Sequence, residues 1–251
     1  MNAYPLKEMN VCTKQPQTFS GKINDFLTED HLDTLKNIMK PVSIKAPTHL
    51  FWEGDDANEL YYIRSGLIKL KKTTSEGKEL ILSIMGSGHL LGEFGGYGEK
   101  KHRYNAELVE DVEIGVVKIK ELENLLAQFG NFAIGFMNWL GFINQKEQSK
   151  LHDLLLNGKA GALASTLIRM SNSYGVTTEQ GILLDIKLTN TDIAEFIGAT
   201  RESVNRFLNI WREDGILSIR NGQITIKKLN ELRCICNCPS YPACPIEICR
   251  I

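Results

Sequence analysis

The stretch TDIAEFIGATRESVNRFL, residues 191–208, decides how the fold of this chain is interpreted. Thr189 stands three residues before Asp192, the spacing of a capping box, and this predicts the start of a short helix. Gly198 then provides a turn, and Thr200 is the type of residue that caps a second helix. Four apolar residues give the second helix a buried face: Val204, Phe207, Leu208 and Trp211. Two capped helices joined by a glycine turn predict a helix-turn-helix.

The other face of the second helix, expected over residues 201–213, carries four polar side chains: Arg201, Glu202, Asn205 and Arg206. Arginine donates two hydrogen bonds to guanine, glutamate accepts one from cytosine, and asparagine pairs with adenine. The alternative is that these are ordinary solvated residues of a surface helix. Asn221-Gly222 between strands at 217–220 and 223–226 predicts a hairpin, a wing that reaches phosphates through Arg220. Helix and wing together predict binding to double-stranded DNA.

Two regions with different predicted secondary structure precede the helix-turn-helix, first a strand-rich one and then a helical one. Residues 41–119 hold short strand-like runs with glycines between them, which predicts an all-β roll. A helix at 120–128 follows, and then a longer one at 132–156. The longer helix carries a seam with alternating spacings of three and four residues: Met137, Leu140, Asn144, Glu147, Leu151 and Leu154. Such a seam suits a paired helix and predicts a homodimer, the alternative being a helix that covers its own core.

The predicted fold class is therefore α+β, with an N-terminal β-roll, a long dimerisation helix and a C-terminal winged helix-turn-helix. The expected parts are a lead-in at 1–24, a β-roll sensor-like domain at 25–128, the dimerisation helix at 129–157, a DNA-binding domain at 158–230 and a cysteine-rich tail at 231–251. Net charge is −1, so any DNA interface is a local basic patch.

Several functions are disfavoured by what the sequence lacks. No apolar run has the length of a signal peptide or of a membrane helix, so we expect a soluble, cytoplasmic protein without a membrane partner. No glycine-rich phosphate loop, nucleophile elbow or paired-histidine motif is present, so we do not expect an enzyme.

Cysteines crowd into the last eighteen residues, which hold five of the six: Cys234, Cys236, Cys238, Cys244 and Cys249. Cys12 lies near the other end of the chain. Structural disulfides are rare in the cytoplasm, and gathered thiolates are soft ligands for iron–sulfur clusters or zinc. The alternative is disulfides or idle thiols.

This order of parts resembles the Crp/Fnr superfamily of transcription regulators. The specific matches are YIRSGLIKL at 62–70, GEFG at 92–95 and the stretch at 191–208. The resemblance implies DNA contacts by Arg201, Glu202 and Arg206. It also implies a palindromic promoter site with half-sites about one helical turn apart, and RNA polymerase as a further partner.

The sequence CPIEICRI at 244–251 is similar to the C-terminus of the Bacillus-type FNR branch, anaerobic regulators with a [4Fe–4S] cluster. The resemblance implies ligation by three C-terminal cysteines and an aspartate, which fall here on Cys244, Cys249 and Asp153. The usual third cysteine position is occupied by Tyr241. Cys238 is the preferred third ligand, with Cys236 and Cys234 as rivals. The implied function is an oxygen-responsive regulator of anaerobic gene expression, in which the cluster ties the tail to the helix of Asp153 beside an Asn157-Gly158 hinge.

Two alternatives remain open. A Crp-like regulator would sense a small effector in the β-roll, where Glu93 is present but the phosphate-binding Arg-Ser-Ala of that branch reads Arg103-Tyr104-Asn105. A zinc-binding structural protein is also chemically possible from four of the thiols, whereas the tail lacks the regular cysteine run of a bacterial ferredoxin electron carrier.

Overall fold

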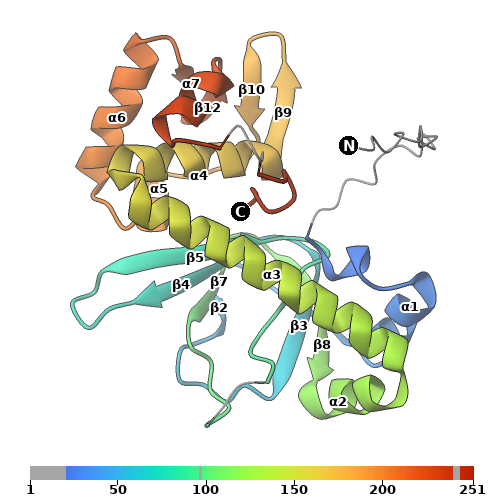
Figure 1. The fold of residues 1–251 in the computed structure, drawn as a ribbon. Coiled ribbons are helices and arrows are strands. Elements are labelled where there is room, and N and C mark those ends of the chain that lie inside the picture. Colours follow the sequence, from blue (N-terminus) through green and yellow to red (C-terminus); the bar gives the residue numbers. More distant parts are fainter. Residues whose placement is uncertain (1–20, 96–97, 240–243) are drawn as a thin grey trace, which may run out of the picture.

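The structure is a computed structural model that describes residues 21–95, 98–239 and 244–251. Cys12, most of the predicted lead-in and Tyr241 lie outside the described residues. A β-roll occupies one end of the molecule and a smaller helical domain the other, and one long helix runs along both (Figure 1).

The β-roll consists of two antiparallel four-stranded sheets, ordered β1-β8-β3-β6 and β2-β7-β4-β5. Alternate residues point inward, as in β7, where Ala106 and Leu108 are buried and their neighbours are half-buried. A short 3-10 turn, η1 (Ile23–Asp25), and α1 (Glu29–Asn37) precede the roll. The strands are β1 (Lys40–Ile44), β2 (His49–Phe51), β3 (Glu59–Ser65), β4 (Ile68–Thr73), β5 (Glu79–Met85), β6 (Leu90–Leu91), β7 (Asn105–Leu108) and β8 (Val112–Lys118).

Two helices lead out of the roll, α2 (Ile119–Gln128) and α3 (Gly130–Leu156). The first half of α3 buries Phe132, Phe136 and Trp139 in a core shared with α1 and α2. Its other side leaves large apolar residues exposed to solvent: Ile134, Met137, Leu140, Leu151, Leu155 and Leu156. The exposed set includes three positions of the predicted seam. This exposed face is the one that a second helix would cover.

The smaller domain begins immediately after α3. Gly158 has a φ of +59°, a left-handed conformation that glycine adopts without strain, and it separates α3 from the next helix. The domain contains α4 (Gly158–Tyr174), β9 (Gly175–Thr178), β10 (Gly181–Leu184), α5 (Asn190–Phe196), α6 (Arg201–Glu213), β11 (Leu217–Arg220), β12 (Gln223–Ile226) and α7 (Leu229–Ile235). Its sheet has the order β11-β12-β10-β9. We call the pair α5 and α6 the reading head.

The predicted fold class is confirmed, and the local differences have physical causes. The sequence predicts a first helix from Thr28 through Lys40, but α1 ends at Asn37 because the chain pairs with β8 from Lys40 onward. The apolar run at 182–186 also predicts a strand, and the observed strand β10 ends earlier, at Leu184. Strands β6 and β9 and helix α7 were not expected. Leu232 of α7 is fully buried in the core of the smaller domain, so the expected tail boundary at residue 231 falls inside a packed helix.

Within the described residues, every helix falls short of the length and apolar character needed to cross a membrane.

Candidate DNA interface and cysteine-lined cavity

Both helices of the reading head begin at the predicted N-terminal caps, Thr189 for α5 and Thr200 for α6. The Asp192 backbone N–H donates to Thr189 Oγ1 over 3.1 Å, and the Thr189 N–H donates to Asp192 Oδ2 over 2.8 Å. Thr200 Oγ1 accepts from the Ser203 N–H at the start of α6. Each cap satisfies backbone donors that a helix leaves unpaired at its first turn.

The predicted DNA-contacting residues do not all have the same surroundings. Arg201, Glu202 and Arg206 are exposed on the first two turns of α6, and the Arg206 guanidinium lies 5.1 Å from the Phe207 ring centroid. Asn205 is half-buried, and its side-chain oxygen accepts a hydrogen bond from Asn190 of α5. Asn205 therefore fastens the two helices of the reading head together. Base contacts by all four residues stay a prediction.

Helix α7 ends in a turn that orients two cysteines. Asn237 adopts a left-handed φ of +49°. Its N–H donates to the Cys234 carbonyl over 3.1 Å, and the Cys238 N–H donates to the Arg233 carbonyl over 2.9 Å. These two bonds are the pattern of a Schellman cap, which ends a helix and reverses the chain. The reversal brings Cys236 and Cys238 against α4.

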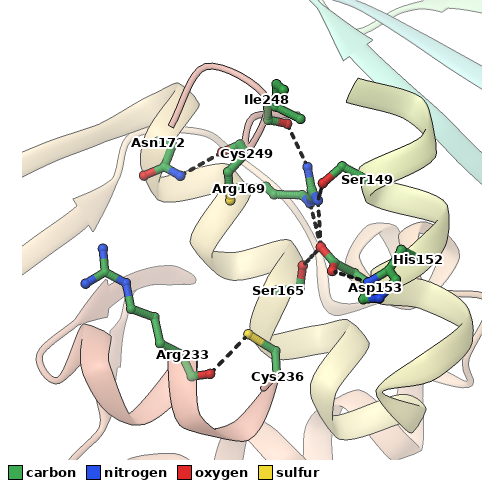
Figure 2. Close-up of polar contacts among 10 residues, drawn as sticks. All are labelled: Ser149, His152, Asp153, Ser165, Arg169, Asn172, Arg233, Cys236, Ile248 and Cys249. Atoms are coloured by element: carbon green, nitrogen blue, oxygen red, sulfur yellow. Dashed lines mark hydrogen bonds and ion pairs between the residues drawn. The ribbon is translucent and has the colours of Figure 1, made fainter. Parts of the chain in front are cut away.

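The end of the chain is held on α4 by three side chains within about one helical turn, and Figure 2 shows two of them, Arg169 and Asn172. Arg169 Nη1 donates to the Ile248 carbonyl over 3.0 Å, and Asn172 Nδ2 donates to the Cys249 carbonyl over 2.6 Å. Ser173 Oγ accepts from the Ile251 N–H over 2.9 Å. The main chain around Cys249 is thus fixed without any bound group.

One cavity of about 100 Å³ lies between α3, α4 and the tail. The residues that line this cysteine-lined cavity are Ser149, His152, Asp153, Ser165, Ile168, Arg169, Cys236, Asn237, Cys238, Pro239, Cys244 and Cys249. The structure therefore brings together Asp153 and the three preferred cysteine ligands, and it adds Cys236. Cys234 is exposed on α7 and does not line the cavity.

The donor set of the cavity matches an iron–sulfur cluster in type but not yet in geometry. Four thiols and one carboxylate in one partly buried cavity are the right donor types. Across residues 21–95, 98–239 and 244–251, however, no three Cys, His, Asp or Glu side chains are close enough as they stand to hold a metal ion. The cavity also has the volume of only a few water molecules. The donor atoms are therefore of the type that an iron–sulfur cluster needs. The cysteine and aspartate side chains must rearrange before a cluster can bind.

Asp153 has an unexpected partner. Its Oδ2 accepts from Ser165 Oγ, from Arg169 Nε over 3.1 Å and from Arg169 Nη2 over 2.6 Å. Arg169 is only 2% exposed and also donates to Ser149 Oγ over 2.8 Å. Arg169, Ser149 and Ser165 were not predicted from the sequence. The available signal was one arginine among the apolar residues of α4.

The thiols of the cavity are poor ligands until they lose their protons. Burial raises the pKa of Cys236 to about 11, and the nearby Cys238 adds to this shift. Burial also raises the pKa of Cys249 to about 11, although the positive charge of Arg169 opposes the shift. Burial and the neighbouring Cys244 raise the pKa of Cys238. A metal that binds here must therefore displace protons.

Comparison with known proteins agrees with the architecture. Residues 41–129 match the cyclic nucleotide-binding domain, and residues 161–235 match the Crp-like helix-turn-helix domain. A β-roll, a long helix and a winged helix-turn-helix in this order define a DNA-binding transcription regulator rather than an enzyme.

The chain is 44% identical over 230 residues to the anaerobic regulatory protein of Bacillus subtilis, which covers 91% of this chain and 95% of that protein. It is 28% identical over 209 residues to the fumarate and nitrate reduction regulatory protein of Salmonella typhimurium, which covers 82% of each. The solved structure of FixK2 from Bradyrhizobium japonicum matches with a TM-score of 0.69 and 20% identity, covering 79% of this chain and 97% of that one. The chain belongs to the Crp/Fnr family, whose regulators bind DNA as dimers.

Proposed function

We propose that this protein is an oxygen-responsive regulator of anaerobic gene expression whose C-terminal cysteines hold a [4Fe–4S] cluster. The observation that carries the proposal is the cysteine-lined cavity, where four thiols of the tail meet Asp153 of α3. The 44% identical relative from Bacillus subtilis is named an anaerobic regulatory protein, which supports the same physiological role.

Cys238, Cys244, Cys249 and Asp153 are the proposed ligands, and Cys236 is a competitor for the third thiolate position. A cluster bound there would supply an oxygen-labile link, because a carboxylate is a harder and weaker partner for its iron than a thiolate. Asp153 comes from α3, and the cysteines come from the chain that follows the reading head. The ligand set therefore spans the two parts that Gly158 separates.

This location explains how the site could control DNA binding. Asp153 lies four residues before Asn157, at the end of the long helix, and α4 carries the reading head beyond it. A link across that junction fixes the direction in which α6 points from the dimer. A coupling of about 1–3 kcal/mol would change DNA affinity by about 5–150-fold.

The same architecture suggests the partners. Two reading heads on a symmetric dimer suit a palindromic promoter site with half-sites about one helical turn apart. Arg201, Glu202 and Arg206 are the proposed base-contacting residues, with Asn205 holding α6 against α5. RNA polymerase is the proposed further partner, and the cytoplasm, where chromosomal DNA lies, is the proposed location.

The test is to purify the full chain without oxygen, to measure iron, sulfide and visible absorption, and to measure promoter binding before and after exposure to air. We expect brown protein whose DNA affinity falls in air. Cys249→Ser should be colourless, whereas Cys234→Ser, at the exposed cysteine, should match wild type. Colourless, metal-free wild-type protein that binds the promoter tightly would reject the proposal, and loss of the cluster in Cys234→Ser would reject this ligand set.

The same protein preparation also distinguishes two alternative functions from the proposed one. Glu93 and Arg103 line a second cavity of about 290 Å³ in the β-roll, a possible effector site. This alternative would be favoured if promoter affinity rose with added cyclic nucleotide and did not change on exposure to oxygen. A structural zinc site would give colourless protein with one zinc per chain, because zinc has no visible absorption.

A further inference from the structure

Arg169 connects three parts of the molecule that are far apart in the sequence. Its guanidinium donates to Ser149 and Asp153 of α3 and to the Ile248 carbonyl of the tail, while its own Cα belongs to α4 (Figure 2). Arginine keeps its charge at any pH that a protein experiences, and its planar fork binds a carboxylate in a fixed orientation. The buried guanidinium therefore fixes the positions of the groups around it.

The two carboxylate oxygens of Asp153 differ in how many hydrogen bonds they accept. Oδ2 accepts three hydrogen bonds, one from Ser165 and two from Arg169. Oδ1 has a single long contact, 3.4 Å to Nδ1 of the exposed His152. One oxygen is thus clamped, and the other keeps most of its capacity to bind a cation.

We propose that Arg169 is the positioning residue of the iron site: it clamps Oδ2 of Asp153 so that Oδ1 is the ligating atom. The inference rests on the proposed function, because it concerns the ligands of the proposed cluster. Metal-binding carboxylates are commonly oriented by such outer hydrogen bonds, and losing the outer partner typically weakens metal binding about 10–100-fold.

A consequence concerns the protein after the cluster is lost. Arg169 links the tail to α3 without any metal, and Asn172 and Ser173 hold the neighbouring main chain on α4. Loss of the cluster then removes one of two links between tail and α3. We therefore expect the tail cysteines to stay beside Asp153 after cluster loss.

The test uses the full chain reconstituted without oxygen with ferrous iron and sulfide, and it measures the rate of iron loss to a chelator. Arg169→Gln should lose iron about tenfold faster or more. Arg212→Gln, the same substitution at an exposed position of α6 outside the cavity, should stay within about threefold of wild type. Thermal melts followed by circular dichroism check that each variant is folded.

The double variants separate positioning from a structural role. If Arg169 acts through Asp153, Arg169→Gln should add less than about twofold in an Asp153→Ala background. If Arg169→Gln does not fold, Arg169→Lys replaces it in the test, because lysine keeps the positive charge but lacks the planar guanidinium. Its faster iron loss should likewise vanish in the Asp153→Ala background.

Equal effects of the Arg169 substitution with and without Asp153 would overturn the inference and leave the proposed function standing. Iron loss at the wild-type rate in Arg169→Gln would do the same. Wild-type protein that takes up no iron would reject both the inference about Arg169 and the proposed function.

Discussion

Lys69 Nζ lies 2.6 Å from Asp192 Oδ1, and this ion pair joins the β-roll to the reading head across 123 residues of sequence. The two side chains are only 11% and 17% exposed, so water screens the pair less than it screens a surface salt bridge. Lys69 belongs to β4, and Asp192 also closes the capping box of α5. Lys78 makes a second contact between the same parts, to the carbonyl of Gly198 in the turn of the reading head. In the structure the reading head is thus docked on the β-roll.

The first prediction removes this ion pair. Lys69→Met keeps the apolar stem but deletes the charge, so it should lower the free energy of unfolding by about 1–3 kcal/mol in urea titrations. The matched control is Lys45→Met, whose pair with Asp111 has the same 2.6 Å separation but is exposed, and should change stability little. Amide hydrogen exchange should also speed up in α5 only for Lys69→Met. Equal stability of the two variants would show that burial of the pair has no energetic consequence.

The second prediction concerns acid. Burial tends to raise the pKa of Asp192, but hydrogen bonds from Lys69 and Thr189 outweigh it and lower the pKa below its ordinary value. A lowered folded pKa means that the pair stabilises the protein above about pH 4 and loses this effect as pH falls through the folded pKa. The stability difference between wild type and Lys69→Met should therefore be constant from pH 6 to 8 and shrink below about pH 4. A difference that persists unchanged in acid would contradict the assignment.

These contacts show why the sequence predicted some features and missed others. The reading head depends on Thr189, Gly198 and Thr200, and each acts on residues within a few positions, so its helices could be predicted with their caps. Arg169 bonds to residues 16, 20 and 79 positions away, and no local pattern pairs it with Asp153. The turn at Asn237 that orients Cys236 and Cys238 was missed because α7 is short and its single fully buried residue gives no periodicity. The cysteines marked the site, but only the tertiary structure separates Cys234 from the others.

The third prediction concerns the exposed face of α6. Arg201→Ala should weaken binding to the specific promoter by about 1–3 kcal/mol, roughly 5–150-fold, if it reads a base pair. Glu213→Ala, exposed at the other end of the same helix, should leave affinity unchanged. Fluorescence anisotropy at one salt concentration, with specific and scrambled duplexes, measures both. A loss that is equal on the two duplexes would instead make Arg201 a phosphate contact.

The last prediction concerns the apolar face of α3. Leu151 and Leu155 are 55% and 70% exposed in the single chain, and Met137 is exposed about four turns before Leu151 on the same side. Burying one leucine is worth about 1.5–3 kcal/mol, and a symmetric dimer buries two copies. Leu151→Glu should therefore weaken dimerisation roughly 100-fold or more. Sedimentation velocity measures the change.

The control is Asn124→Glu, which adds the same charge at an exposed position of α2, outside the apolar face of α3. It should remain dimeric at concentrations where Leu151→Glu is a monomer. Because each monomer carries one reading head, the Leu151→Glu protein should also lose most of its affinity for a palindromic site while keeping its iron content. A dimer that tolerates Leu151→Glu would place the contact between subunits on another face of the molecule.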